Sequence, residues 1–74
     1  MSEVVKVDSE LVIRLRAVEG LTQDEFGRRI KVTGGMISEI ERGMKQVSRK
    51  LAIRIVAEFG LTPESAQRLR ELPA

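Results

Sequence analysis

The sequence predicts an all-α fold, a compact domain of five helices. Apolar residues recur at spacings of three and four, as on one face of a helix, and helix-capping residues flank each apolar segment. One short segment, "EVVKV" at residues 3–7, is instead rich in β-branched residues. We therefore expect an N-terminal arm over residues 1–8 and one helical domain over residues 9–72.

The arm and the first helix meet near residue 8. "EVVKV" is compatible with a disordered arm or with a short strand that pairs across a dimer, and the sequence leaves both open. The first helix is expected in "ELVIRLRAVE", where Asp8 or Ser9 can serve as the N-cap. Gly20 is placed to end it in a left-handed conformation.

The second and third helices are separated by only three residues, "KVT". The second helix begins after Thr22, whose side chain forms a capping box with Glu25, and it runs to about Ile30. Thr33 is the next N-cap, so the third helix is expected over Gly34–Arg42.

Two further helices complete the domain. Ser48 caps a fourth helix in "RKLAIRIVAEF", which Gly60 ends. Thr62, with Pro63 at the first helical position, begins a fifth helix, and Pro73 lies just past its end.

The predicted core is mainly aliphatic, because the chain holds two phenylalanines and no tryptophan or tyrosine. Val32 is expected in the turn between the second and third helices. The helical positions with core spacing are Val12, Leu15, Val18, Phe26, Ile30, Ile37, Ile40, Leu51, Ile55 and Phe59.

Composition excludes several classes of function. The 74 residues include no cysteine and no histidine, so disulfides and the usual zinc sites are excluded, and no nucleophile has a histidine to activate it. No apolar run could span a membrane, and no secretory signal is visible. We expect a cytoplasmic protein that is not an enzyme, with no cofactor and no small-molecule ligand.

Charge is distributed unevenly along the chain. Residues 28–54 hold eight basic and two acidic residues, a net charge of +6, whereas residues 1–27 carry −3 and residues 55–74 carry −1. A basic middle third suggests a polyanionic partner, although a solvated basic face would give the same pattern.

The short link predicts a helix-turn-helix from the second and third helices. So few residues hold the two helices at a steep angle, and Gly27, on the inner side of the second helix, lets the third approach closely. The segment "QDEFGRRIKVTGGMISEIER" at residues 23–42 resembles the helix-turn-helix of the Cro and phage-repressor type, the xenobiotic-response-element or lambda-repressor-like family. The resemblance extends through "VSRKLAIRIVAEFG" and covers roughly residues 10–62.

The resemblance implies a sequence-specific transcriptional regulator of double-stranded DNA, a repressor that binds as a two-fold homodimer. The third helix would lie in the major groove, Gln23 and Thr33 would lie near phosphates, and Arg16 and Glu41 would bridge the first and third helices. The dimer surface is expected on the fifth helix with the end of the fourth. The residues expected to contact DNA are Gln23, Thr33, Gly34, Gly35, Met36, Ser38, Glu39, Arg42, Lys45 and Gln46.

Two features depart from the family pattern. Lys31 occupies the turn position where the family usually has glycine, so either it is left-handed or the turn differs. Gly34 and Gly35 stand where amide or basic side chains usually read bases. Either their main chain approaches DNA closely and readout falls on Met36, Ser38 and Glu39, or the fold serves as a protein-interaction module of antitoxin or anti-repressor type.

Overall fold

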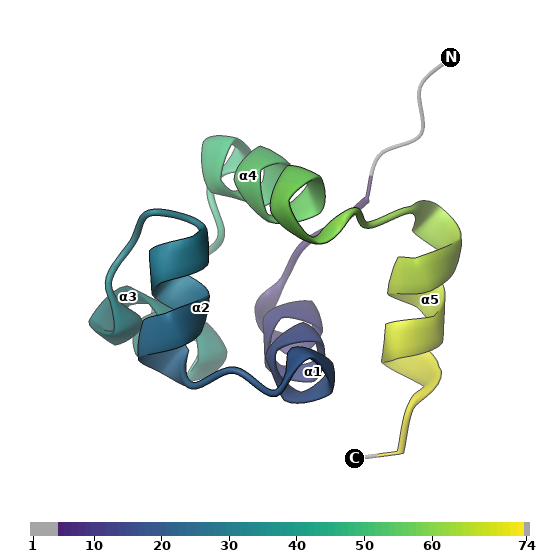
Figure 1. Cartoon of the computed structure of the whole chain (residues 1–74), viewed down its shortest axis with the longest axis horizontal. Helices are drawn as coiled ribbons and strands as arrows, with labels where there is room; N and C mark the ends of the chain where they lie inside the picture. Colours follow the sequence, from purple (N-terminus) through teal and green to yellow (C-terminus); the bar gives the residue numbers. More distant parts are fainter. Residues whose placement is uncertain (1–4, 74) are drawn as a thin grey trace.

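The chain folds into five helices, and the computed structural model describes residues 5–73 (Figure 1). Within this part there is no strand, and residues 5–8 precede the first helix as extended or irregular chain. The expectation for "EVVKV" falls partly outside the described residues, at Glu3 and Val4. The helices are α1 (Ser9–Glu19), α2 (Gln23–Arg29), α3 (Gly34–Glu41), α4 (Arg49–Phe59) and α5 (Pro63–Glu71).

Local sequence signals set the helix ends as predicted. Asp8 is the N-cap of α1, and its carboxylate accepts the Leu11 backbone N–H at 3.0 Å. Gly20 ends that helix with φ +68°. The helix α3 ends at Glu41, one residue earlier than expected, with Arg42 as its C-cap. The predicted caps at the other N-termini are confirmed for Thr22, Thr33, Ser48 and Thr62.

The helix α1 lies between α3 and α5 and contacts both (Figure 1). The helices α2 and α3 pack against each other on one side of it, and α5 covers the opposite side. Consequently, α3 has one face toward the core and another that no helix covers.

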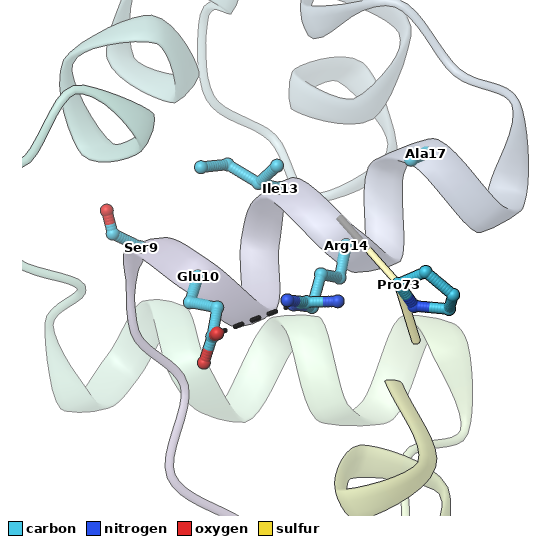
Figure 2. Close-up of a pocket in the computed structure, with 6 residues that line it drawn as sticks. All are labelled: Ser9, Glu10, Ile13, Arg14, Ala17 and Pro73. Atoms are coloured by element: carbon cyan, nitrogen blue, oxygen red, sulfur yellow. Dashed lines mark ion pairs between the residues drawn. The ribbon is translucent and has the colours of Figure 1, made fainter. Parts of the chain in front are cut away.

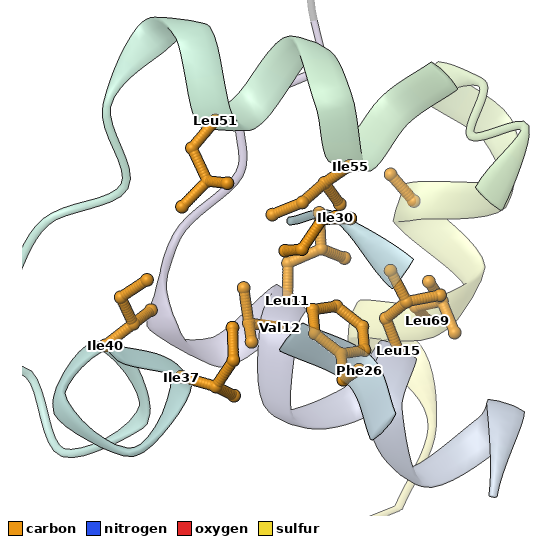
Figure 3. Close-up of a cluster of buried hydrophobic side chains, with 11 residues drawn as sticks. Leu11, Val12, Leu15, Phe26, Ile30, Ile37, Ile40, Leu51, Ile55 and Leu69 are labelled. Atoms are coloured by element: carbon orange, nitrogen blue, oxygen red, sulfur yellow. The ribbon is translucent and has the colours of Figure 1, made fainter. Parts of the chain in front are cut away.

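One buried apolar cluster joins the five helices (Figure 3). Most of the predicted core is confirmed, and three residues that the spacing did not single out, Leu11, Ala66 and Leu69, are also buried. The buried cluster comprises Leu11, Val12, Leu15, Phe26, Ile30, Ile37, Ile40, Leu51, Ile55, Ala66 and Leu69.

The prediction that Val18 belongs to the core is wrong. Its side chain is 56% exposed. Val18 follows Leu15 at core spacing, but it lies in the last turn of α1, at an open hollow that Phe59 and Leu72 also line. Helical spacing identifies the face of a helix, whereas burial also requires a neighbouring element at that height.

Phe59 is at the edge of the core rather than inside it. Its ring stacks on that of Phe26, with centroids 5.0 Å apart, and the Arg29 guanidinium lies 4.8 Å from the Phe59 centroid. Arg29 also pairs with Glu58 at 2.7 Å, an exposed pair. The ring is therefore half-buried, with a cation near it.

Glu41 ties three helices together. Its carboxylate accepts hydrogen bonds from Arg16 Nε at 2.6 Å and Nη2 at 2.9 Å, and from Gln23 Nε2 at 3.2 Å. Arg16 lies on α1 and Gln23 on α2, so the bridge between the first and third helices is confirmed and includes the second. The Arg16 hydrogen bond holds the pKa of Glu41 below its usual value, although burial opposes this.

We expect Glu41→Gln to lower the free energy of unfolding by about 2 kcal/mol near neutral pH, because Arg16 loses a charged, largely buried partner. A depressed carboxylate pKa stabilises the fold above the unfolded-state value and loses that contribution as pH falls through the folded value. The difference between variant and wild type should therefore shrink below the usual glutamate value of 4.5.

Urea denaturation at several pH values measures this difference. The matched control is Glu58→Gln, which removes the exposed partner of Arg29 and should cost less than about 1 kcal/mol. Equal losses in the two variants would contradict a special role for Glu41.

Candidate nucleic-acid interface

The close packing of α2 and α3 depends on Gly27. A Cβ at this position would lie 2.6 Å from the Val32 carbonyl oxygen and 3.0 Å from the Thr33 carbonyl carbon, both backbone atoms. Lys31 adopts φ +65° in the intervening turn, so it accepts the left-handed conformation for which glycine is usual. The Val32 N–H returns to the Gly27 carbonyl at 2.9 Å. The sequence prediction of a close approach at Gly27 is confirmed.

The two glycines that begin α3 have different environments. Gly34 is buried, and a Cβ there would lie 1.8 Å from Asp24 Oδ1 and 3.0 Å from the Asp24 Cα. Gly35 is exposed, and the nearest atom to its Cβ position is Thr33 Oγ1 at 3.8 Å. Gly34 thus makes room for an α2 side chain, whereas packing does not require glycine at position 35.

The uncovered face of α3 carries most of the predicted contact residues. They line one shallow, open hollow that continues from the start of the helix to the loop after it. Within it, Met36 also packs against the core and Thr33 Oγ1 already accepts the Met36 N–H at 3.1 Å. The residues that line this hollow, named here the α3 hollow, are Thr33, Gly35, Met36, Ser38, Glu39, Arg42 and Lys45.

The other three predicted contact residues lie outside the α3 hollow. Gln23 is half-buried and donates to Glu41, so one of its amide hydrogens is engaged within the protein. Gly34 faces Asp24 of α2 and is buried, which contradicts its expected place on the outward face. Gln46 is exposed and lines a neighbouring hollow together with Lys45.

Exposed cations surround the end of α3 and the start of α4. Arg42, Lys45, Arg49 and Lys50 are exposed and form no ion pair within residues 5–73. Arg49 and Lys50 occupy the first turn of α4, where the positive end of the helix dipole disfavours cations. Sequence reasoning counted both in the basic third but did not include them in the site, although their first-turn position is readable from the Ser48 cap.

A second hollow lies on α1, on a different part of the surface (Figure 2). Ile13, Ala17 and Pro73 line it together with an ion pair between Glu10 and Arg14 at 3.5 Å. Ile13 is 42% exposed. The surface is apolar and unlike the α3 hollow.

Other kinds of site find no support in the described part of the chain. Histidine, cysteine and carboxylate side chains do not gather there in threes as a metal ion would require. None of the five helices has the length and apolarity needed to cross a bilayer.

Comparison with known proteins gives one match. The family model described as helix-turn-helix matches residues 13–65, which include α2, the turn and α3. Curated proteins and solved structures give no match. Because the matched segment is well over half of the chain and the helices agree with it, the chain belongs to the helix-turn-helix family of xenobiotic-response-element, lambda-repressor-like type, a family of DNA-binding regulators.

Proposed function

We propose that this protein is a sequence-specific transcriptional repressor that inserts α3 into the major groove of double-stranded DNA. The observation that carries the proposal is the uncovered α3 hollow flanked by exposed cations that form no ion pair within residues 5–73. Phosphates are recognised mainly by such cations, and base edges by side chains of the helix in the groove. Family membership supports DNA binding in general.

The residues that would contact phosphates lie in the loop after α3 and in the first turn of α4. Arg42 and Lys45 line the α3 hollow, and Arg49 and Lys50 stand at the N-terminus of α4. Cations in the first turn of a helix destabilise it. Helix stability therefore does not account for Arg49 and Lys50 at these positions, whereas binding of a polyanion does. Gln23 contributes through the amide hydrogen that Glu41 leaves free.

The side chains that would contact base edges are the few that line the α3 hollow. Glu39 can accept a hydrogen bond from the cytosine N4 amino group, and Met36 can contact a thymine methyl group. Gly35 has no side chain to hold the helix away, so its main chain can approach the duplex closely.

Repressors of this type bind two half-sites about 34 Å apart as a homodimer. The surface that α5 forms with the ends of α1 and α4 has the apolar character that a dimer requires, since Phe59, Leu61 and Leu72 line one hollow there with Val18. Val18 and Leu72 are 56% and 42% exposed. Pairing through this region would cover apolar groups that the single chain exposes.

A protein-interaction module on the same fold is the second candidate. It is favoured by the apolar hollow on α1 around Ile13 (Figure 2) and by the lack of a side chain at the exposed Gly35. Glu39 also counts toward it, because DNA phosphates repel a carboxylate in the groove.

Salt dependence separates the two candidates. If the protein neutralises several phosphates, its affinity for a duplex of arbitrary sequence should fall by orders of magnitude between about 50 and 200 mM salt. Lys45→Ala should weaken binding to all duplexes alike and reduce the log–log salt slope by about one. Fluorescence anisotropy titrations measure both quantities. Absence of duplex binding at low salt would refute the proposal and favour the interaction module.

Glu39→Ala should change the base preferred at one position of each half-site, since it removes the acceptor that would bond cytosine N4. Selection of bound duplexes from a randomised pool, carried out with wild type and variant, measures this. Inverted half-sites among the selected sequences would support the homodimer. An identical preference profile for the two proteins would exclude Glu39 from readout.

Gly35→Ala should raise the free energy of unfolding by up to about 1 kcal/mol, because alanine is the better helix former and its Cβ meets no close neighbour. The same variant should bind the selected duplex more weakly if the main chain approaches DNA at this point. The control Gly34→Ala should lower stability, since Asp24 must move. Unchanged affinity in a stabilised Gly35→Ala would contradict close approach.

A further inference from the structure

We propose that Lys6, in the N-terminal arm, binds the phosphate backbone of the same duplex that α3 reads. The inference rests on the proposed function and extends it beyond the helix-turn-helix. Its basis is a groove between the arm and the loop joining α3 and α4. This arm–loop groove is lined by Lys6, Val7, Asp8, Ser9, Gly43, Lys45, Gln46 and Val47.

The arm–loop groove continues the α3 hollow. Lys45 lines both, so the two concave surfaces meet at that residue. A phosphate backbone that contacts Lys45 would therefore lie beside the groove that Lys6 lines. Lys6 is exposed and lines the arm–loop groove together with Gln46.

The arm and the first residue of α1, Ser9, are held in place by three sets of contacts. Ser9 Oγ donates to the Ile40 carbonyl at the end of α3 at 2.7 Å. On the opposite side, Arg70 Nη2 of α5 donates to the Lys6 carbonyl at 2.8 Å. Val5 and Val7 pack against the core. Because the backbone at Lys6 is already ordered, binding a phosphate there costs side-chain entropy but little loop-ordering entropy.

The charge that remains in the groove is positive. Asp8 is the one acidic residue in the lining, and Arg70 Nη1 lies 3.1 Å from its Oδ1. Burial would raise the pKa of Asp8, but the Leu11 N–H, Arg70 and the charge of Lys6 outweigh burial and lower it, so Asp8 is ionised. Arg70 compensates Asp8 only in part, because its Nη1 also lies 2.9 Å from Glu10 Oε1. Lys6 and Lys45 form no ion pair within residues 5–73. The groove lining thus carries two ammonium groups against one carboxylate, a net charge of +1.

The test compares salt slopes for a duplex of arbitrary sequence. Lys6→Gln should reduce the slope of log affinity against log salt by about 0.9, so the fall in affinity between about 50 and 200 mM salt becomes about 3.5-fold smaller. Lys6→Arg keeps the charge and should restore the wild-type slope. Both variants alter only the exposed side chain of residue 6. The contact with Arg70 is made by the backbone carbonyl of this residue, so neither variant removes it.

The matched control is Arg28→Gln, which removes the same charge. Arg28 is an exposed residue of α2 and lines neither the α3 hollow nor the arm–loop groove. Its loss should leave the slope close to that of the wild type, since only long-range attraction changes.

The outcomes separate the inference from the proposed function. A slope for Lys6→Gln equal to that for Arg28→Gln, while Lys45→Ala lowers the slope, would overturn the role of Lys6 and leave DNA binding intact. A wild-type protein that binds no duplex at low salt would overturn both. A reduced slope in Lys6→Gln with recovery in Lys6→Arg supports the phosphate contact.

Discussion

The orientation of α3 depends on the carboxylate of Glu41. A helix of eight residues has little stability of its own, so contacts with its neighbours must hold it. Ile37 and Ile40 anchor its inner face in the core, and Glu41 at its end bonds Arg16 of α1 and Gln23 of α2. The Glu41 side chain is only 9% exposed, and a charge so covered is tolerated because three donors satisfy it. Apolar packing sets the depth of α3, and this network limits its rotation.

Three glycines in the helix-turn-helix lie in different environments, and each has a different physical explanation. Gly27 is required by backbone approach, because any Cβ would collide with the carbonyl of Val32. Gly34 is required by a side chain, Asp24, and the neighbouring α2 backbone. Gly35 meets neither requirement, and glycine there weakens the helix. Neither packing nor helix stability explains glycine at position 35, and this favours a functional explanation for it.

The features that the sequence predicted best are local. A cap such as Thr22 or Thr33 bonds within its own turn, so helix ends could be read from residues three positions apart. Burial of Leu69 and exposure of Val18 depend on where α5 crosses α1, which no short window contains. In the candidate site, the outward residues followed from helical spacing and family resemblance. The burial of Gly34 did not, since it depends on where α2 places the Asp24 side chain.

The carboxylates of this domain constrain where a polyanion can lie. Asp24 and Glu25 stand in the first turn of α2, and Glu41 lies beside Gln23. They stabilise helices and the fold, but they oppose a phosphate at the N-terminus of α2, where Gln23 offers a single remaining amide hydrogen. The attractive charge is concentrated instead at the other end of α3, around Lys45. A duplex bound by this surface would therefore be anchored chiefly through the α3–α4 loop and the groove beside it, with the contact at α2 secondary.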